Sequence, residues 1–262
     1  MKLQVKNLNA EYKKQKVLNN ISFEIKSGDF ICLCGPNGCG KSTLLSCLAN
    51  LQNDSLIISK QSSILLDNKN INEIKTKDLA KHIAFMQQNE FCSWDFSVED
   101  FVLQGRYCHS QHGIYSKEDL QIVHKNLSLL EIMNLAKKNL HQISGGEFQK
   151  VRLARALTQE PDFLLLDEAA NNLDFSFEPK LMEFLSKLSK EKKIGIIISI
   201  HNLNIASQFG QNIILLTKNN NQEQKMFHGN SRQVFTKENL KLAFNQDFTL
   251  YEHPINKSIQ IY

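Results

Sequence analysis

A glycine-rich stretch with one lysine follows an apolar run near the start of this 262-residue chain. It reads GPNGCGKST and fits the spacing G-x-x-x-x-G-K-[ST] through Gly35, Gly40, Lys41 and Ser42. Glycines let successive backbone N–H groups curve around a phosphate, and a helix that begins here directs its positive N-terminal end at the same group. Lysine supplies a charge for the outer phosphates, and the serine hydroxyl is a ligand for Mg²⁺. The stretch predicts a nucleotide site.

Two adjacent acids, Asp167 and Glu168, follow the apolar run 163–166. In open parallel sheets, ligands bind beyond the carboxyl ends of the strands, where these acids are expected. Asp167 is suited to hold Mg²⁺ through water, and Glu168 to orient or deprotonate an attacking water. A solvent-facing loop is the alternative, and the glycine-rich stretch upstream argues against it. His201 follows the apolar residues 195–200 and is a candidate for the outermost phosphate, unless it is structural.

The third polar feature is HQISGGEFQKVRLARAL, residues 141–157. Ser144 and Glu147 have the S-x-x-E spacing of a capping box, which starts a helix. Gly145 and Gly146 are not explained by a helix start, because glycine costs about 0.5–1 kcal/mol relative to alanine inside a helix. The pair predicts that bare backbone is needed at this helix end.

Cysteine and histidine offer weaker signals. Cys39 lies inside the glycine-rich stretch, close to an expected helix N-terminus that would lower the pKa of its thiol. A small residue in a tight loop is the plainer interpretation. Cys108, His109 and His112 could form a metal site, but their spacing matches no strong zinc pattern, so a polar loop is favoured.

Composition places the chain among ordinary globular proteins, with 42% hydrophobic and 22% charged residues and a net charge of +4. Lys and Arg are interleaved with acids, which argues against a dedicated nucleic-acid-binding protein. The longest aliphatic run, residues 194–200, is far shorter than the roughly 20 apolar residues that a membrane span requires. The N-terminus has no apolar segment of a secretory signal, so a cytoplasmic location is expected.

Short apolar strands and amphipathic helices alternate, which predicts an α/β fold with a largely parallel sheet. Strands are expected at residues 3–8, 21–25, 30–34, 63–66, 83–87, 163–167, 195–200 and 213–217. Helices are expected at residues 41–51, 98–104, 117–132, 147–159, 180–192, 203–209 and 237–243.

No strand is expected between residues 88 and 160. Leu120, Val123, Leu127 and Leu130 recur there at helical spacing, as a face that packs against a core. We therefore expect a single domain, residues 1–262. Its α/β core comprises residues 1–87 and 161–262, and an all-helical subdomain, residues 88–160, is inserted into it.

The phosphate and acidic motifs resemble those of the ATPase subunit of an ATP-binding cassette (ABC) transporter. Residues 35–43 look like the Walker A loop, and residues 163–168 look like Walker B with its catalytic glutamate. Residues 143–147 are similar to the family signature LSGGQ, and residues 172–174 to the D-loop. His201 looks like the switch histidine of the same family.

The resemblance includes two further residues of the active site. Tyr12 falls where the family has an aromatic ring that stacks on adenine, and Gln88 resembles the Q-loop glutamine, with Gln87 as the alternative. A P-loop NTPase fold is implied, with a RecA-like core, an N-terminal antiparallel β subdomain and an inserted helical ABC-specific subdomain. Two subunits are implied to sandwich two ATP molecules in a head-to-tail homodimer.

The resemblance also assigns roles to individual residues. ATP would be bound by Tyr12, Gly35, Pro36, Asn37, Gly38, Cys39, Gly40, Lys41, Ser42 and Thr43 of one subunit and by Ser144, Gly145, Gly146 and Asp174 of the other. Catalytic roles would fall to Lys41, Gln88, Glu168 and His201, and Mg²⁺ would be held by Ser42, Gln88 and Asp167.

Two segments resemble one branch of the family, the importer ATPases for iron siderophores, haem and cobalamin. They are SVEDFVLQGRY, residues 97–107, and the ending at residues 234–254. An ATPase of this branch powers uptake by ATP-driven dimer closure. It would bind the cytoplasmic face of the membrane through separate polytopic permease subunits. A substrate-binding protein would deliver the transported molecule to these subunits. A zinc or manganese importer, or a soluble ABC ATPase of cluster assembly, is the alternative.

Overall fold

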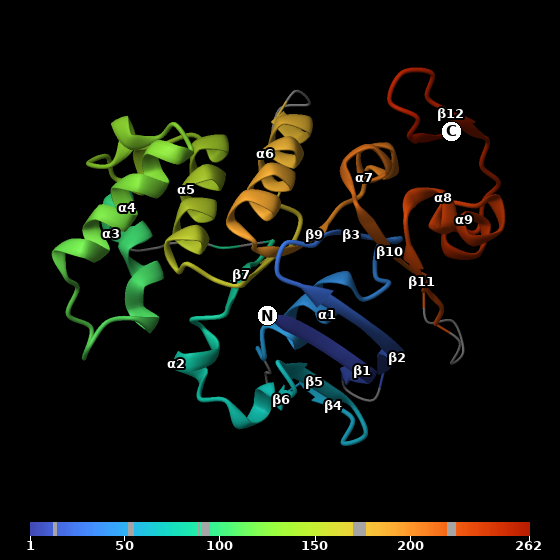
Figure 1. The fold of residues 1–262 in the computed structure, drawn as a ribbon, viewed down its shortest axis with the longest axis horizontal. Coiled ribbons are helices and arrows are strands. Elements are labelled where there is room, and N and C mark those ends of the chain that lie inside the picture. Colours follow the sequence, from blue (N-terminus) through green and yellow to red (C-terminus); the bar gives the residue numbers. More distant parts are fainter. Residues whose placement is uncertain (13–14, 52–54, 89, 91–94, 170–176, 219–223) are drawn as a thin grey trace.

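The computed structural model describes residues 1–12, 15–51, 55–88, 90, 95–169, 177–218 and 224–262. The described residues form two large β-sheets, a small two-stranded sheet near the C-terminus and the helices that surround them (Figure 1). The N-terminal sheet is antiparallel, with the order β2-β1-β5-β6 and with β4 also paired to β1. Its strands are β1 Lys2–Tyr12, β2 Gln15–Lys26, β4 Leu56–Ile58, β5 Ser63–Leu66 and β6 Lys69–Asn70.

The second sheet has the order β11-β10-β3-β9-β8-β7 and is parallel except for its edge strand β11. Its strands are β3 Phe30–Cys34, β7 Ile83–Met86, β8 Phe163–Leu166, β9 Gly195–Ser199, β10 Asn212–Leu216 and β11 Met226–Gly229. The predicted α/β fold with a largely parallel sheet is confirmed.

Strands β3, β8 and β9 are completely buried because they divide two hydrophobic cores. Along β3, Cys32 and Cys34 face the core that contains the helices α3–α6, whereas Ile31 and Leu33 face the core shared with the antiparallel sheet. Side chains alternate between the faces of a strand, so a strand covered on both sides is apolar at every position. This explains the continuous apolar runs in the sequence.

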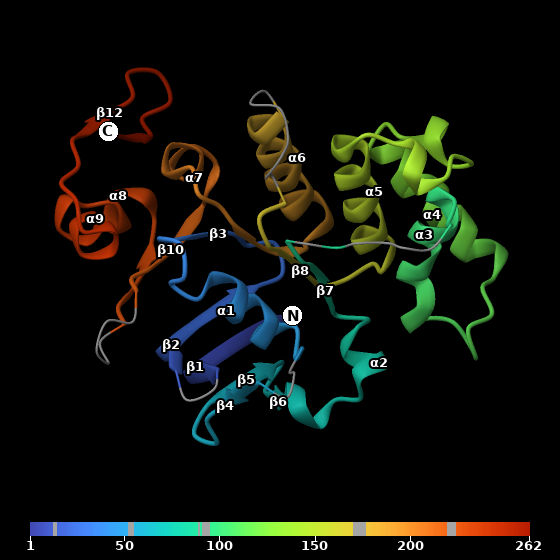
Figure 2. The same cartoon turned by 180° about the vertical axis from the view of Figure 1, so that it is seen from behind.

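Helices cover both faces of the parallel sheet. Helix α1 (Lys41–Leu48) lies on the side of the antiparallel sheet and buries Leu44, Leu45 and Leu48 in that core. Helices α6 (Phe177–Lys192) and α7 (Leu203–Phe209) lie on the opposite side, as both views of the ribbon show (Figures 1 and 2).

Between β7 and β8 the described residues form helices and turns and no extended strand. They are α3 Val98–Leu103, η2 Gln104–Cys108, α4 Lys117–Leu129, η3 Met133–Leu135, η4 Leu140–Gln142 and α5 Gly145–Thr158. Val123 and Leu127 are fully buried and Leu130 is nearly so, as expected for the helical face, while Leu120 is only half-buried. These helices stand to one side of both sheets (Figure 2).

The sequence did not predict several short elements. They are η1 Ile71–Glu73, α2 Thr76–Leu79, α8 Ser231–Val234, β12 Leu250–Glu252 and β13 Ile259–Ile261, together with β4, β6 and β11. The expected C-terminal helix is present as α9 Lys237–Phe244. The short elements carry too few residues for a periodic pattern, and their pairing partners are distant in sequence.

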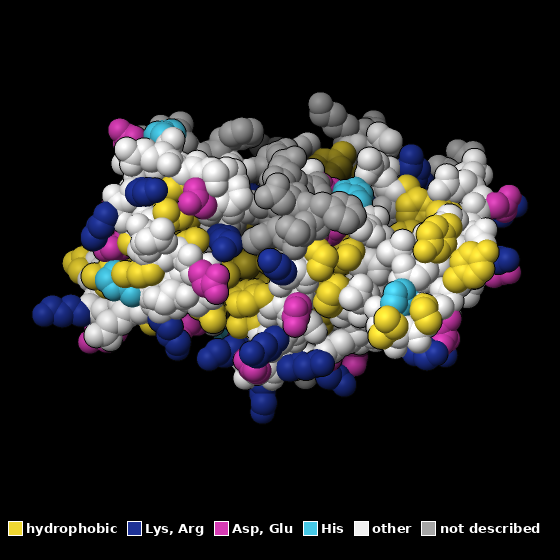
Figure 3. All heavy atoms as spheres, turned by 90° about the horizontal axis from the view of Figure 1, so that it is seen from above, with side chains coloured by type: hydrophobic (Ala, Val, Ile, Leu, Met, Phe, Trp, Pro, Cys, Tyr) yellow, Lys and Arg dark blue, Asp and Glu magenta, His cyan; other side chains and the backbone are white. Residues whose placement is uncertain are grey.

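None of the described helices has the length and apolar content needed to cross a bilayer. On the face shown in Figure 3, Lys and Arg side chains are interspersed with Asp and Glu rather than gathered in one stripe. Hydrophobic side chains gather on the right of that view, over the C-terminal end of the chain. Tyr251, Ile255 and Tyr262 of this region are 62%, 86% and 72% exposed.

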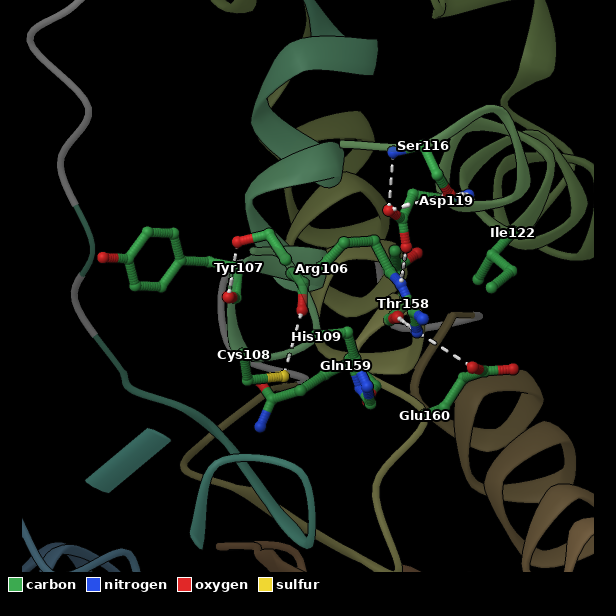
Figure 4. Close-up of polar contacts among 12 residues, drawn as sticks. Arg106, Tyr107, Cys108, His109, Ser116, Asp119, Ile122, Thr158, Gln159 and Glu160 are labelled. Atoms are coloured by element: carbon green, nitrogen blue, oxygen red, sulfur yellow. Dashed lines mark hydrogen bonds and ion pairs between the residues drawn. The ribbon is translucent and has the colours of Figure 1, made fainter. Parts of the chain in front are cut away.

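Arg106 joins three parts of the helical region from a buried position (Figure 4). Its Nε donates to Asp119 Oδ1 at 2.7 Å, and its Nη1 donates to Thr158 O at 2.9 Å and to Glu160 Oε2 at 2.8 Å. Asp119 also completes the capping box of α4 with Ser116. The guanidinium therefore links η2, the start of α4 and the end of α5.

The neighbouring Cys108 and His109 are satisfied by backbone. Cys108 Sγ contacts Gly105 O, and His109 Nε2 is hydrogen-bonded to Gln159 O at 2.9 Å. No cluster of metal-ligating side chains occurs within the described part of the chain. Both contacts are made with backbone carbonyl oxygens of the helical region.

Replacing Arg106 by methionine should lower the free energy of unfolding by about 3–5 kcal/mol, because it leaves the buried Asp119 carboxylate without its charged partner. Urea unfolding followed by circular dichroism measures this loss. The matched control is Arg232→Met, which removes an exposed ion pair with Glu252 and should change stability by less than about 0.5 kcal/mol.

The loss should also depend on pH. Burial opposes ionisation of Asp119, but hydrogen bonds from Ser116 and Arg106 outweigh it and lower the pKa of this carboxyl. A lowered folded-state pKa means that the contribution is complete above the ordinary Asp pKa and disappears as the pH falls through the folded-state value. Equal losses for Arg106→Met and Arg232→Met at neutral pH would contradict this account.

Candidate active site

The parallel sheet brings three polar segments to one edge. Strands β3, β9 and β8 are neighbours, with Leu33 beside Ser199 and Leu166 beside Ile198. Gly35 follows β3, Asp167 follows β8, and His201 is the second residue after β9, so all three lie at the same carboxyl edge of the sheet. Strand order, and not proximity in sequence, therefore assembles the site.

The loop 35–43 closes around the ammonium group of Lys41. Lys41 is 5% exposed, and its Nζ donates to Gly35 O at 2.8 Å and to Pro36 O at 3.3 Å. Gly35 has a φ of 146°, and a Cβ there would lie 2.5 Å from Leu216 O on β10. Only glycine fits such a close approach, so the first glycine of the motif seats the loop against the sheet.

The structure contradicts the lowered pKa expected for Cys39. Its side chain is only 1% exposed, and burial raises the pKa of the thiol, an effect that the positive charge of Lys41 offsets only in part. A helix N-terminus alone would lower the pKa of this thiol, but the packing of the loop buries the sulfur and has the larger effect. Cys39 is therefore a small, buried residue in a tight loop, as the plainer of the two interpretations expected.

One hydroxyl group organises the two acids. Ser199, at the end of β9, is 2% exposed; its Oγ donates to Asp167 Oδ1 at 2.7 Å and accepts from Glu168 N–H at 2.7 Å. Glu168 has a φ of 50°, a left-handed conformation that is unusual for a residue with a side chain and that occurs often at functional sites. Ser199 thus satisfies the buried Asp167 carboxylate and stabilises the turn that directs Glu168.

Glu168 meets two of the predicted site residues. His201 Nε2 donates to Glu168 Oε1 at 2.6 Å, and Gln88 Nε2 donates to Glu168 Oε2. Gln88, and not Gln87, therefore contacts the glutamate. A carboxylate beside a histidine and an amide can accept a proton from water and hold that water in line, which is the chemistry of hydrolysis.

The predicted helix start at Ser144 is confirmed. Ser144 is the N-cap of α5, its Oγ accepts from Glu147 N–H at 3.3 Å, and Glu147 Oε2 accepts from Ser144 N–H at 2.8 Å. These hydrogen bonds lower the pKa of Glu147. Ser144 and Gly145 are exposed, and a Cβ at Gly145 would meet no described atom within 4 Å. Packing within the chain therefore does not require glycine here.

Two residues of α5 that no motif in the sequence indicates are hydrogen-bonded to the segments around Glu168. Gln149 Nε2 donates to Ala169 O at 3.0 Å, and the guanidinium of Arg152 donates to the carbonyl oxygens of Gln87 and Gln88. Arg152 is itself oriented by Gln149 Oε1 at 2.6 Å and Glu90 Oε2 at 3.2 Å. The only local signal is the i,i+3 spacing of the two side chains on one helix face.

Other predicted site residues are placed in part. Tyr12 is the last residue of β1, and its half-buried side chain packs against the core that the antiparallel sheet shares with the parallel sheet. Asp174 and the rest of the predicted D-loop, residues 172–174, lie outside the described residues. Their roles stay predictions.

The donors around Lys41 fit a magnesium nucleotide. Ser42 is exposed at the first turn of α1, and within the described part of the chain the Asp167 side chain is hydrogen-bonded through Oδ1, to Ser199. Gln88 adds an amide oxygen. Hydroxyl, carboxylate and amide oxygens are the hard donors that Mg²⁺ prefers. These residues would hold the ion, which would neutralise charge on the outer phosphates.

Comparison with known proteins supports the same interpretation. Residues 18–171, more than half of the chain, match the ABC transporter family. The hemin import ATP-binding protein HmuV of Escherichia coli O157:H7 is 32% identical over 263 residues, covering 98% of this chain and 97% of HmuV.

Two solved structures extend the comparison. One belongs to a transporter described as being of the metal-chelate type, in an inward-facing conformation; its TM-score is 0.82 at 26% identity, covering 99% of this chain and 95% of that one. The other is the dimeric, post-hydrolysis ATP-binding cassette MJ0796 with ADP and phosphate bound; its TM-score is 0.70 at 28% identity, covering 87% of this chain and 99% of that one.

The fold and site define a P-loop ATPase with an inserted helical region. The chain belongs to the ABC transporter family, as its ATP-binding, ATP-hydrolysing subunit. The family resemblance predicted from the motifs is confirmed.

The geometry at Glu168 predicts the effect of one substitution. Glu168→Gln keeps the size of the side chain but removes the group that accepts a proton, so turnover should fall by about 100-fold or more while ATP still binds. Phosphate release and nucleotide binding, measured on the same preparation, test this.

Glu99→Gln is the matched control for Glu168→Gln. The Glu99 side chain is also 10% exposed and also contacts a histidine, His124, but it lies in the helical region away from Lys41. This variant should keep turnover within about twofold of the unmodified protein. Full turnover by Glu168→Gln would remove the catalytic role assigned to Glu168.

Proposed function

We propose that this protein is the ATPase subunit of an importer for iron chelates such as haem or ferric siderophores, or for cobalamin. The observation that carries the proposal is the end-to-end similarity to the hemin import ATP-binding protein HmuV, which covers nearly all of both chains. The metal-chelate type transporter with a TM-score of 0.82 supports the same substrate class. Zinc or manganese import and soluble cluster assembly are the alternatives.

In the proposed mechanism, two subunits form a head-to-tail dimer around ATP. The exposed start of α5 supports this arrangement. The N–H groups of its first turn lie at the positive end of the helix dipole. Gly145 has no side chain to cover them, and a Cβ at this position would meet no described atom of the chain within 4 Å. A phosphate held by Lys41 of a second copy is the group these N–H donors would contact. ATP then lies within the interface, so binding favours closure and hydrolysis favours release.

A substitution at the cap of α5 tests the dimer. Ser144→Arg places a bulky cation where the second copy's nucleotide would sit, so ATP-driven dimerisation should be lost while ATP binding by the isolated subunit stays within about twofold. Light scattering of the Glu168→Gln background with ATP reports dimerisation, and equilibrium titration reports binding.

Ser97→Arg controls for the loss of a helix cap. Ser97 is the N-cap of α3 in the same helical region and accepts from Asp100 N–H at 3.1 Å, but it does not belong to the signature. Losing such a cap costs about 0.5–2 kcal/mol of stability and should leave dimerisation intact. If Ser144→Arg also dimerises normally, Ser144 is only a helix cap.

The proposed permease contact is the groove between the helical region and the parallel sheet. It encloses about 260 Å³ and is lined in part by Phe85 and Met86 of β7, Gln104 of η2 and Arg155 of α5. Gln88 is the second residue after β7. Arg152 donates to its backbone carbonyl and lies one turn before Arg155 on α5. A segment of a membrane subunit bound in this groove would therefore contact the elements that position Glu168.

Reconstitution tests the proposed substrate class. The subunit and the polytopic permease that co-purifies with it are placed in proteoliposomes with ATP inside, and uptake of haemin, a ferric siderophore, cobalamin, Zn²⁺ and Mn²⁺ is compared. We expect ATP-dependent uptake of one of the first three, which the Glu168→Gln variant abolishes. Uptake restricted to Zn²⁺ or Mn²⁺, or recovery with a soluble scaffold and no membrane partner, would overturn the proposal in favour of the corresponding alternative.

A further inference from the structure

The side chain of Gln224 bridges three separate elements beside the phosphate-binding loop. Its Nε2 donates to Cys39 O at 2.7 Å and to Thr217 O at 3.1 Å, and its Oε1 accepts from Asn19 N–H at 2.9 Å. Asn19 lies in β2, Cys39 in the loop 35–43, and Thr217 directly after β10. Both amide hydrogens and the amide oxygen are used, so this side chain has one well-defined orientation.

The backbone next to Gln224 is fixed by hydrogen bonds that do not involve the loop 35–43. Thr217 N–H donates to Lys225 O at 3.0 Å, and Lys225 N–H donates to Thr217 Oγ1 at 2.9 Å. These bonds join the end of β10 to the start of β11 on either side of residues 219–223. The same corner also supports the first glycine of the motif, since Leu216 O is the atom that a Cβ at Gly35 would strike.

The hydrogen bond to Cys39 O determines which way the next N–H points. The described chain has no cis peptide bond, and in a trans peptide the C=O and the following N–H point in opposite directions. Since Cys39 O faces Gln224, the Gly40 N–H faces away from it. Gly40 has a φ of 103°, and a Cβ there would lie 2.7 Å from Leu18 Cδ2, so only glycine fits between the loop and β2 at this position.

We propose that Gln224 is a positioning residue for nucleotide binding, which holds the Cys39–Gly40 peptide so that the Gly40 N–H is presented to a phosphate. The proposal rests on the nucleotide-binding role of the loop 35–43. Without Gln224, the free peptide could turn its carbonyl oxygen toward the phosphate, which would replace an attraction by a repulsion. Preorganised N–H donors bind without a cost of reorientation, and that is the contribution of this side chain.

The test separates positioning from general stabilisation. Gln224→Met keeps the length of the side chain and removes the three hydrogen bonds. We expect the Kd values for ADP and ATP, measured by titration with Mg²⁺ present, to rise by about fivefold, the size of effect produced by losing one typical hydrogen bond. KM for ATP should rise by a similar factor with kcat within about twofold, because the contact serves bound substrate and transition state equally.

Gln159→Met is the matched control. Gln159 is also a half-buried glutamine whose amide donates to two backbone carbonyls, those of Ala80 and Ile83, but it lies at the far end of α5. It should lower the melting temperature without changing either Kd. Gln224→Asn, one methylene too short to reach Cys39 O, should reproduce the affinity loss of Gln224→Met and serves if the methionine variant does not fold.

The outcomes are distinct. If Gln224→Met or Gln224→Asn binds ADP as tightly as the unmodified protein, while its melting temperature falls as in Gln159→Met, Gln224 is structural only and the proposal fails. If the unmodified protein itself binds neither ADP nor ATP, the nucleotide-binding role of the loop fails instead. A loss of kcat with unchanged KM would also overturn the assignment, because it would place Gln224 in the chemical step.

Discussion

The parallel pairing of β3, β9 and β8 is the constraint on which the site depends. Each strand is buried on both faces and ends at the same edge. The loop after β3, the acids after β8 and the histidine after β9 therefore reach one edge of the sheet, although the loop precedes the acids by more than a hundred residues and His201 follows Glu168 by 33. Ser199 links the ends of β9 and β8, because its hydroxyl donates to the Asp167 carboxylate and accepts from the Glu168 N–H. A shift of one residue between β8 and β9 would turn this hydroxyl to the other face of the sheet.

Local patterns were sufficient to predict much of this arrangement. The glycine-rich loop, the acids after an apolar run and the capping box at Ser144 are each encoded within a few residues, and each lies where it was expected. The continuous apolar strands indicated a sheet covered on both sides, which the two cores explain. Short motifs are readable because their geometry is determined by neighbours in sequence.

Contacts between distant segments were not predictable in the same way. Four side chains, Ser199, Gln149, Arg152 and Gln224, act through backbone carbonyls or carboxylates that lie 20 to 185 residues away in the chain, and no spacing in the sequence indicates such partners. For Cys39, the nearby helix N-terminus indicated a lowered thiol pKa, beside the plainer interpretation of a small residue in a tight loop. Burial raises the pKa of this thiol instead. Local sequence identifies the chemical groups, whereas packing determines their protonation and orientation.

Helix α5 is hydrogen-bonded to both segments that carry the groups around Glu168. Arg152 holds the backbone that leads to Gln88, and Gln149 holds the backbone that leaves Glu168. The helix N-terminus at Ser144 lies at the exposed surface, away from these bonds. Binding free energies are reciprocal, so a ligand at Ser144 must change the nucleotide affinity of this chain by the same factor as the nucleotide changes affinity at Ser144. In the proposed head-to-tail dimer, α5 would therefore connect the nucleotide of one subunit with the segments around Glu168 of the other.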